Sequence, residues 1–531
     1  MKIKSRILSG ALMLFSANLI VKLAGAVYKI PLQRILTDTG MGYFNVAYSI
    51  YTWFYLISTA GLPIAVSVCV AKALAEGDRV KAEAVYRVSA LIFSSFGALC
   101  SLSMAVFAGH LSRAASLDNA RLCIVAAAPS VFLSSVSAAV RGYYQGHGIM
   151  WVTAVSQLIE ALGKLFFGLA LARISAGTGS DLFVTASHAV IGISCGALLS
   201  ALFCVSVKTF YKRIRAGTNV KIYKGTAREV MRTALPVTLS ASVMNLVSLS
   251  DVFTAPALLV RSGYTQLQSA AIYGNYSTVC TSLINLPMMF VYPVCGSVLP
   301  ALSSAVQKND RKRAESISAF AYRTVYALVF PCAVGLAVLS YEIPSLIFPE
   351  TSAALAAPML AALCPSLMFS CTLSVTDTIL QAAGRAGKTV ISMACGSAAK
   401  MISTVLLFMY SSAGRLSIPA GTCVCYAVSA LMNIVFLRRS GDPVPSAYDV
   451  IKPALCSVIC GLTAGTVFTF AGQTFYGAAP TIIATVSAAA VYSGALTVTG
   501  YTKTIFDGIR MKNKEKDHKN DRIREKREVQ L

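Results

Sequence analysis

The chain has 531 residues, of which 56% are hydrophobic and 13% are charged. Soluble globular domains carry about 25% charged residues and about 45–50% apolar residues, so this composition excludes an ordinary soluble protein. Apolar segments of roughly 20 residues, the length that crosses a bilayer core, recur from one end of the chain to the other. Because short segments of alternating polarity are absent, a membrane β-barrel is not expected. The sequence therefore predicts an all-α polytopic membrane protein.

We predict about 14 transmembrane helices and no soluble domain. Residues 208–233 are expected to form a cytoplasmic linker, and the charged residues 503–531 a cytoplasmic tail, because they offer little apolar surface to bury. The predicted spans lie near residues 7–30, 42–70, 86–109, 121–140, 149–172, 184–207, 234–259, 271–301, 318–340, 355–380, 389–411, 417–437, 451–471 and 478–502.

The formal net charge of +24 would fit a protein that binds nucleic acid, but the placement of the basic residues is better explained by membrane topology. If the N-terminus is cytoplasmic, the 14 predicted spans put 36 of the 46 Lys and Arg on the cytoplasmic side of the membrane and seven on the outer side. Such an asymmetry is what the positive-inside rule predicts, and it places both termini in the cytoplasm. The basic loops are expected to attract anionic membrane lipids, and no nucleic-acid partner is needed.

The sequence repeats itself at long range. At an offset of 236 residues, 128–166 aligns with 364–402, and at an offset of 232, 41–54 aligns with 273–286. Each half holds six spans, so both halves enter the membrane in the same direction, as in transporters with parallel repeats. We therefore expect an N-terminal six-helix lobe, a C-terminal six-helix lobe and two additional helices; these are 1–207, 234–437 and 438–502, with the linker 208–233 between the lobes.

The first span carries a polar stripe. Lys22 and Lys29 are seven residues apart, about two helical turns, and Asn18 lies one turn before Lys22. Pro31 is expected to end this helix. Ionisable residues inside spans usually face a cavity or a partner, although Lys29 could instead extend to the outer interface. The stripe is thus a candidate cavity lining.

The seventh span corresponds to the first in the repeat. At the offset of 232, Lys22 aligns with Thr254 and Lys29 aligns with Arg261, and Asp251 lies beside this face. Together the two faces could line a cavity that holds an anion, with Asp251 pairing with Lys22 or serving as a proton or cation site. Asp377, inside the tenth span, is expected to pair with Lys400 or to line the same cavity.

Other charged residues have simpler interpretations. Glu160 and Lys164 are four residues apart and are expected to neutralise each other, and Arg141 is expected to anchor an inner loop. The sequence contains no cluster of metal-ligating residues, no cofactor motif and no nucleophile–base motif, so it favours a transporter over an enzyme.

Several passages resemble a known family. They are KLAGAVYKIPLQRIL (22–36), STAGLPIAVSVCVAKALAEGD (58–78), RGYYQGHGIMWVTAVSQLIEALGK (141–164) and a long stretch at 271–310. The chain is similar to the stage V sporulation protein B group of polysaccharide biosynthesis proteins. This group belongs to the multidrug/oligosaccharidyl-lipid/polysaccharide (MOP) exporter superfamily, together with the lipid II flippases.

The resemblance implies two six-helix lobes around a central cavity and two extra helices. It also implies transport of an undecaprenyl-diphosphate-linked saccharide to the outer leaflet of the cytoplasmic membrane, alongside other cell-envelope synthesis proteins. In the lipid II flippases, cations on spans 1 and 8 hold the diphosphate; the matching residues here are Lys22 and Lys29, with Arg261 as the counterpart in the second half. The alternatives are a cation-coupled drug exporter of the same superfamily and a membrane-embedded glycan-processing enzyme.

Overall fold

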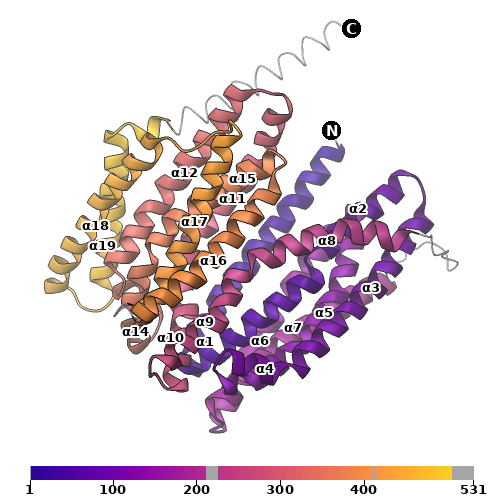
Figure 1. Cartoon of the computed structure of the whole chain (residues 1–531), viewed down its shortest axis with the longest axis horizontal. Helices are drawn as coiled ribbons and strands as arrows, with labels where there is room; N and C mark the ends of the chain where they lie inside the picture. Colours follow the sequence, from indigo (N-terminus) through magenta and orange to yellow (C-terminus); the bar gives the residue numbers. More distant parts are fainter. Residues whose placement is uncertain (1, 211–224, 411–413, 505–531) are drawn as a thin grey trace, which may run out of the picture. The chain divides into compact units, whose positions relative to one another are not determined.

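The protein is described by a computed structural model covering residues 2–210, 225–410 and 414–504, and within these residues every regular element is a helix (Figure 1). The predicted linker lies partly, and the predicted tail almost wholly, outside the described residues. The α-helices are α1 (Lys2–Thr59), α2 (Leu62–Ala75), α3 (Arg79–Val106), α4 (Ala108–Ala114), α5 (Arg121–Gly146), α6 (Trp151–Gly177), α7 (Leu182–Phe210), α8 (Thr226–Met244), α9 (Leu246–Arg261), α10 (Gln266–Asn275), α11 (Thr281–Gln307), α12 (Arg311–Val338), α13 (Glu342–Ile347), α14 (Glu350–Leu363), α15 (Pro365–Ala382), α16 (Ala386–Tyr410), α17 (Ser417–Arg439), α18 (Ala447–Thr474) and α19 (Ala479–Val498).

Among the described residues, 11 helices are long and apolar enough to cross a membrane, or 12 if the bent pair α14 and α15 forms one span. The predicted span 42–70 and most of the predicted span 7–30 fall within one apolar stretch, Ser16–Ala75. The predicted span 234–259 is divided between α8 and α9, which are not among the eleven. The polytopic all-helical membrane fold is therefore confirmed, whereas the number 14 stays a prediction.

The first helix does not end at Pro31, so that expectation was wrong. The chain remains helical through Pro31, and its backbone leaves helical geometry only at Thr37, where φ is 58° and ψ is −178°. Just after this break, Asp38 accepts hydrogen bonds from the side chains of Gln33 and Asn275. A proline inside a membrane helix is tolerated where neighbouring groups satisfy the backbone atoms that it frees. The position of the break thus coincides with side-chain hydrogen bonds that the sequence did not reveal.

The helices belong to two compact units. One comprises residues 1–278 with 408–415, and the other comprises 279–407 with 416–531. The division after Thr278 falls inside a π-helical turn, Tyr276–Cys280, that connects α10 to α11. Single π-helical turns interrupt the regular hydrogen-bond ladder and often occur at functional sites. The lobe boundaries inferred from the repeat stay a prediction.

Corresponding positions of the repeat adopt the same local structure. Asp78 and Asp310, which align at the offset of 232, are the N-caps of α3 and α12. Each carboxylate accepts a hydrogen bond from the backbone N–H three residues later, at 2.7 and 3.1 Å. The preceding residues, Gly77 and Asn309, both have a positive φ, of 79° and 54°. The repeat therefore preserves the turn that precedes α3 in the first half and α12 in the second half.

Two glycines allow α1 and α10 to cross in direct backbone contact. A Cβ added to Gly42 would lie 2.1 Å from the carbonyl oxygen of Ala270, and one added to Gly274 would lie 2.1 Å from that of Asp38. At the offset of 232, Gly42 corresponds to Gly274 and Asp38 to Ala270. The contact is therefore reciprocal, as contacts across a two-fold axis are. This reciprocity agrees with the offset of 232 found in the sequence.

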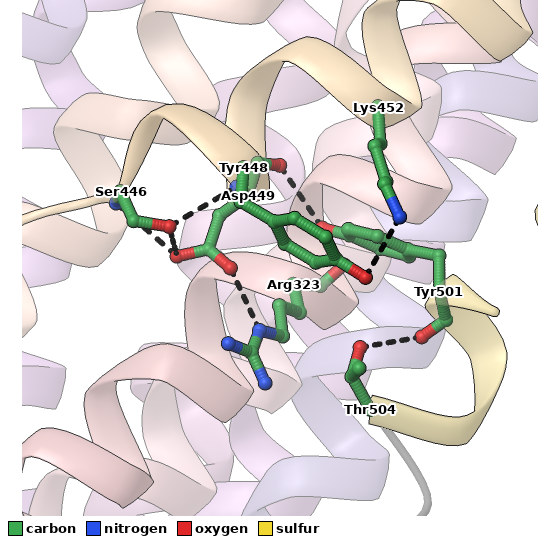
Figure 2. Close-up of polar contacts among 7 residues, drawn as sticks. All are labelled: Arg323, Ser446, Tyr448, Asp449, Lys452, Tyr501 and Thr504. Atoms are coloured by element: carbon green, nitrogen blue, oxygen red, sulfur yellow. Dashed lines mark hydrogen bonds and ion pairs between the residues drawn. The ribbon is translucent and has the colours of Figure 1, made fainter. Parts of the chain in front are cut away.

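The two additional helices are attached to α12 by a compact polar cluster (Figure 2). The carboxylate of Asp449 accepts a hydrogen bond from Arg323 Nε at 2.7 Å and completes a capping box with Ser446 at the start of α18. Tyr501, just after α19, donates its hydroxyl hydrogen to the backbone oxygen of Asp449 at 3.0 Å, and its burial raises the pKa of this phenol. Asp449 thus joins α12 through its carboxylate and the end of α19 through its backbone oxygen, at the start of α18.

Replacing Arg323 with alanine should destabilise this attachment, because it leaves the buried carboxylate of Asp449 without its cation. We expect a loss of about 1–3 kcal/mol in the free energy of unfolding, measured as a lower melting temperature in detergent. The control is Arg311→Ala on the same helix, since Arg311 and Glu315 form an exposed pair that should contribute little. Equal melting temperatures for the two variants would contradict the role given to Asp449.

Candidate functional site

The predicted polar stripe lies on the first part of α1, where its members differ in exposure. Asn18 and Lys22 are exposed, and Lys29 is half-buried. Lys29 is therefore the member of the stripe whose surroundings the structure defines best. The expected pairing of Lys22 with Asp251 stays a prediction.

The second-half residues of the predicted site lie on α9. Asp251 and Thr254 are half-buried, and Thr254 donates its hydroxyl hydrogen to the backbone oxygen of Ser250, one turn earlier, at 2.7 Å. Arg261 is exposed at the last turn of α9, where a cation is favourable at the negative end of the helix dipole. No hydrogen bond or ion pair in the described part of the chain joins Arg261 to Lys29.

Lys29 contacts the π-helical turn at the end of the first unit. Its Nζ donates a hydrogen bond to the backbone oxygen of Ser277 at 3.3 Å. In a π-helical turn the backbone hydrogen bonds are rearranged, which makes a carbonyl available to a side chain. A lysine therefore reaches the point at which the two units divide, and a ligand that competes for its ammonium group would change this contact.

A second lysine of the first unit lies among aromatic rings. Lys164 projects from α6 over two aromatic rings of α1, with its Nζ 4.2 Å from the ring centre of Tyr48 and 5.6 Å from that of Tyr28. The sequence analysis did not connect this lysine with α1.

The expected pair between Glu160 and Lys164 is replaced by a different ion pair. Glu160 accepts a hydrogen bond from Arg141 Nη2 at 2.7 Å, and this arginine also donates to Ser156 and Ser200, both at 2.8 Å. Arg141 is only 5% exposed and lies inside α5, so its assignment as a loop anchor was also wrong. A guanidinium group can satisfy several acceptors at once, which makes it a better buried partner than an ammonium group.

Glycines fix the position of α6 against α7. A Cβ on Gly192 would lie 2.3 Å from the backbone of Gly168, and a Cβ on Gly196 would lie 2.4 Å from the backbone oxygen of Glu160. Gly192 and Gly196 form a GxxxG motif, which lets membrane helices approach closely. This packing fixes the position of the α6 segment that carries Lys164 against α7.

The carboxylate of Asp377 is hydrogen-bonded to the side-chain amide of another residue. It accepts a hydrogen bond from Asn433 Nδ2 at 2.7 Å, and Asn433 Oδ1 accepts one from Ser392 at 2.6 Å. At the offset of 236, Asp377 corresponds to Arg141 and Ser392 to Ser156. The second half therefore repeats the polar cluster of the first with the opposite charge at its centre. The pairing of Asp377 with Lys400 stays a prediction.

Sequence reasoning did not assign a role to Tyr28, Tyr48 or Ser277. A signal for the aromatic face was present, because Phe44, Tyr48, Tyr51 and Tyr55 follow helical spacing and form successive ring contacts along α1. The role of Ser277 depends on a π-helical turn, for which the sequence offered no comparable signal.

Replacing Glu160 with glutamine should destabilise the first unit, because it removes the charge that compensates the buried Arg141. We expect a loss of about 3 kcal/mol in the free energy of unfolding, visible as a lower melting temperature in detergent. The control is Glu229→Gln, which removes a surface ion pair with Lys72. Its effect on the free energy of unfolding should be small, because water screens such a pair. A Glu160→Gln variant as stable as this control would argue against the Arg141 pair.

Comparison with known proteins identifies a family and a fold. Residues 7–306 match the sequence profile of the family described as "Polysaccharide biosynthesis protein". Stage V sporulation protein B of Bacillus subtilis (strain 168) is 22% identical over 472 residues, 87% of this chain and 90% of that protein. Lipid II flippase MurJ of the same organism is 23% identical over 458 residues, 82% of this chain and 83% of that protein.

The structural comparison agrees with the sequence comparison. A solved structure of lipid II flippase MurJ in an inward closed conformation superposes with a TM-score of 0.70 at 15% identity, covering 92% of this chain and 98% of that chain. An inward-facing multidrug transporter of the MATE family and the MOP superfamily superposes with a TM-score of 0.62 at 14% identity, covering 80% of this chain and 98% of that chain. The chain therefore has the helical fold of these proteins, whereas the two six-helix lobes around a central cavity stay a prediction.

Proposed function

Because the chain belongs to the polysaccharide biosynthesis protein family, we propose that it is a transporter that flips an undecaprenyl-diphosphate-linked saccharide across the cytoplasmic membrane. The fold shared with a lipid II flippase and a multidrug transporter supports a transporter of the MOP superfamily rather than an enzyme. The sequence relatives, a lipid II flippase and a sporulation protein, favour a cell-envelope precursor as the cargo.

The observation that carries this proposal is the position of Lys29. The Lys29 side chain is half-buried in a membrane helix, where a charge is costly unless it faces a partner or a cavity. One partner of its ammonium group in the structure is the neutral backbone oxygen of Ser277. A phosphate oxygen carries a full negative charge and forms a stronger, charge-assisted hydrogen bond. A diphosphate headgroup would therefore displace the carbonyl, with Lys22 and Arg261 as further cations of the site.

Alternating access provides the transport step in this proposal. The π-helical turn at Tyr276–Cys280 lies where the two compact units divide, and Lys29 binds its Ser277. Binding of an anion at Lys29 would release this turn and so favour a change between conformations. Asn18, Asp251, Thr254 and Asp377 are candidates for lining a cavity or for binding a coupling ion. A membrane potential of 100 mV contributes about 2.3 kcal/mol for each charge moved, enough to bias such a cycle.

The topology proposed for this function places both termini and the basic loops in the cytoplasm, against anionic membrane lipids. Its partners would be the lipid-linked saccharide and other cell-envelope synthesis proteins. A cation-coupled drug exporter of the same superfamily is the second candidate. The lysines of the first unit, Lys29 and Lys164, argue against it, because a cavity for cationic drugs needs acidic residues.

Replacing Lys29 with alanine should abolish or strongly reduce transport, because the phosphate loses its cation. The measurement is growth of cells that lack their own lipid II flippase and express this protein. Lys22→Ala is expected to act in the same direction. We expect about a tenfold or greater loss for Lys29→Ala, the effect of losing one charge-assisted hydrogen bond worth about 1.5–3 kcal/mol.

The matched control is Lys72→Ala, a lysine in an exposed ion pair on α2, which should leave growth unchanged at equal expression. Full activity of Lys29→Ala would refute the cation site. Failure of the wild-type protein to support growth, together with transport of another lipid-linked saccharide, would refute the lipid II substrate and keep the transporter.

A further inference from the structure

An exposed tyrosine lies next to two cations where the additional helices join α12 (Figure 2). The side chain of Tyr448, in the first turn of α18, is 37% exposed. Lys452 Nζ lies 4.1 Å from the centre of its ring, and Arg323 Cζ lies 5.9 Å from it. Among the seven residues drawn in Figure 2, Asp449 supplies the one carboxylate, and this carboxylate is buried. The cluster therefore carries one more positive charge than negative charge.

Lys452 binds neutral acceptors. An ammonium group has three N–H donors. In Lys452, hydrogen bonds lead to the hydroxyl oxygen of Tyr448 and to the backbone oxygen of Thr499, both at 3.0 Å. The carboxylate of Asp449 is paired with Arg323, and no ion pair within residues 2–210, 225–410 and 414–504 includes Lys452. An anion at this ammonium group would form a stronger, charge-assisted hydrogen bond than either neutral acceptor.

Arg323 adds donors from α12. Its Nε donates to Asp449 at 2.7 Å, while neither Nη atom takes part in a hydrogen bond in the described part of the chain. The side chain is 27% exposed, so it is not enclosed by protein. A guanidinium group binds phosphate strongly because its N–H bonds form a planar fork. The cluster thus offers an ammonium group of α18 and a guanidinium group of α12 to an anion.

The cluster lies at a membrane surface. The helices α18 and α19 are each long and apolar enough to cross a membrane, and the cluster contains the first turns of α18 and the residues just after α19. Tyrosine and lysine at the ends of membrane helices are typical of the interface with water. Next to Lys452, α18 exposes large apolar side chains along one face, at Ile451, Leu455, Val458 and Leu462. A phosphate group bound at the cluster would therefore have an apolar helix surface beside it for acyl chains.

We propose that Lys452 and Arg323 bind the phosphate group of an anionic phospholipid, whose acyl chains lie against the exposed apolar face of α18. A zwitterionic lipid has its own cation beside the phosphate, so the surplus positive charge of the cluster selects an anionic lipid. The bound lipid connects α12 with α18 and thereby strengthens the attachment that Asp449 provides. This inference concerns the additional helices and does not depend on the cargo in the proposed function.

The test measures lipid binding to the full-length protein in a neutral detergent. The probes are phosphatidylglycerol, phosphatidylcholine with the same acyl chains, and inorganic phosphate. Native mass spectrometry gives the dissociation constant of each lipid, and the melting temperature with and without each probe is the second readout. The variants are Lys452→Gln and Arg323→Lys, which retains a cation for Asp449. The control is Arg311→Gln, which removes the same charge from an exposed pair on α12.

The wild-type protein and Arg311→Gln should bind phosphatidylglycerol more tightly than phosphatidylcholine, and phosphatidylglycerol should raise their melting temperature. Lys452→Gln should weaken binding of phosphatidylglycerol by about fivefold or more, the effect of one basic residue at an anionic surface. Its binding of phosphatidylcholine should change little. Arg323→Lys should also weaken binding of phosphatidylglycerol, because the free part of the guanidinium fork is lost.

The contrary outcomes are distinct. A purely structural role of Lys452 would lower the melting temperature without lipid and leave the ratio of the two lipid dissociation constants unchanged, which would overturn the proposal. An equal loss of phosphatidylglycerol binding in Arg311→Gln would show attraction by overall charge and would also overturn it. Equal stabilisation by inorganic phosphate would replace the lipid with a soluble anion. If Lys452→Gln does not fold, unchanged phosphatidylglycerol binding by Arg323→Lys decides against the site.

Discussion

An ionised side chain in an apolar helix bundle must be compensated by charge or by dipoles, and this requirement organises the first unit. Arg141 is almost completely buried, and Glu160 with two serine hydroxyls surrounds its guanidinium group. Because one carboxylate cannot neutralise two cations, Lys164 must be balanced in another way. The pairing of Arg141 therefore has a consequence four residues after Glu160 on α6, where the ammonium group of Lys164 lies over the ring of Tyr48.

The helix packing gives these charges fixed positions. The GxxxG motif of α7 brings its backbone against that of α6, and the crossing of Gly42 with Gly274 does the same for α1 and α10. Side chains at such crossings would separate the helices, because the spaces that glycine leaves are occupied by backbone atoms. The α6 segment with Lys164 is therefore fixed against α7, and the α1 segment after Lys29 is fixed against α10.

The pattern of apolar segments and the repeat predicted the class of fold, and the repeat also marked corresponding turns such as those at Asp78 and Asp310. Contacts between helices could not be predicted in the same way. Glu160 and Lys164 have ideal spacing for a pair on one helix, yet Glu160 binds Arg141 because α5 brings a better donor to it. Similarly, Pro31 is a strong local signal for the end of a helix, and the break instead occurs at Thr37. Local spacing ranks the possible partners on one helix and contains no information about donors from a neighbouring helix.

The repeat also explains why the proposed anion site need not have a copy in the second half. Arg141 and Asp377 occupy corresponding positions, but the first is neutralised by a carboxylate, whereas the second accepts a hydrogen bond from the uncharged amide of Asn433. Lys400, which corresponds to Lys164, is only 2% exposed, whereas Lys164 is half-buried over the ring of Tyr48. The two halves thus retain the same helices and have changed the chemistry on them. An accessible surplus of positive charge belongs to the first half, and an asymmetric ligand such as a lipid-linked diphosphate requires only one such site.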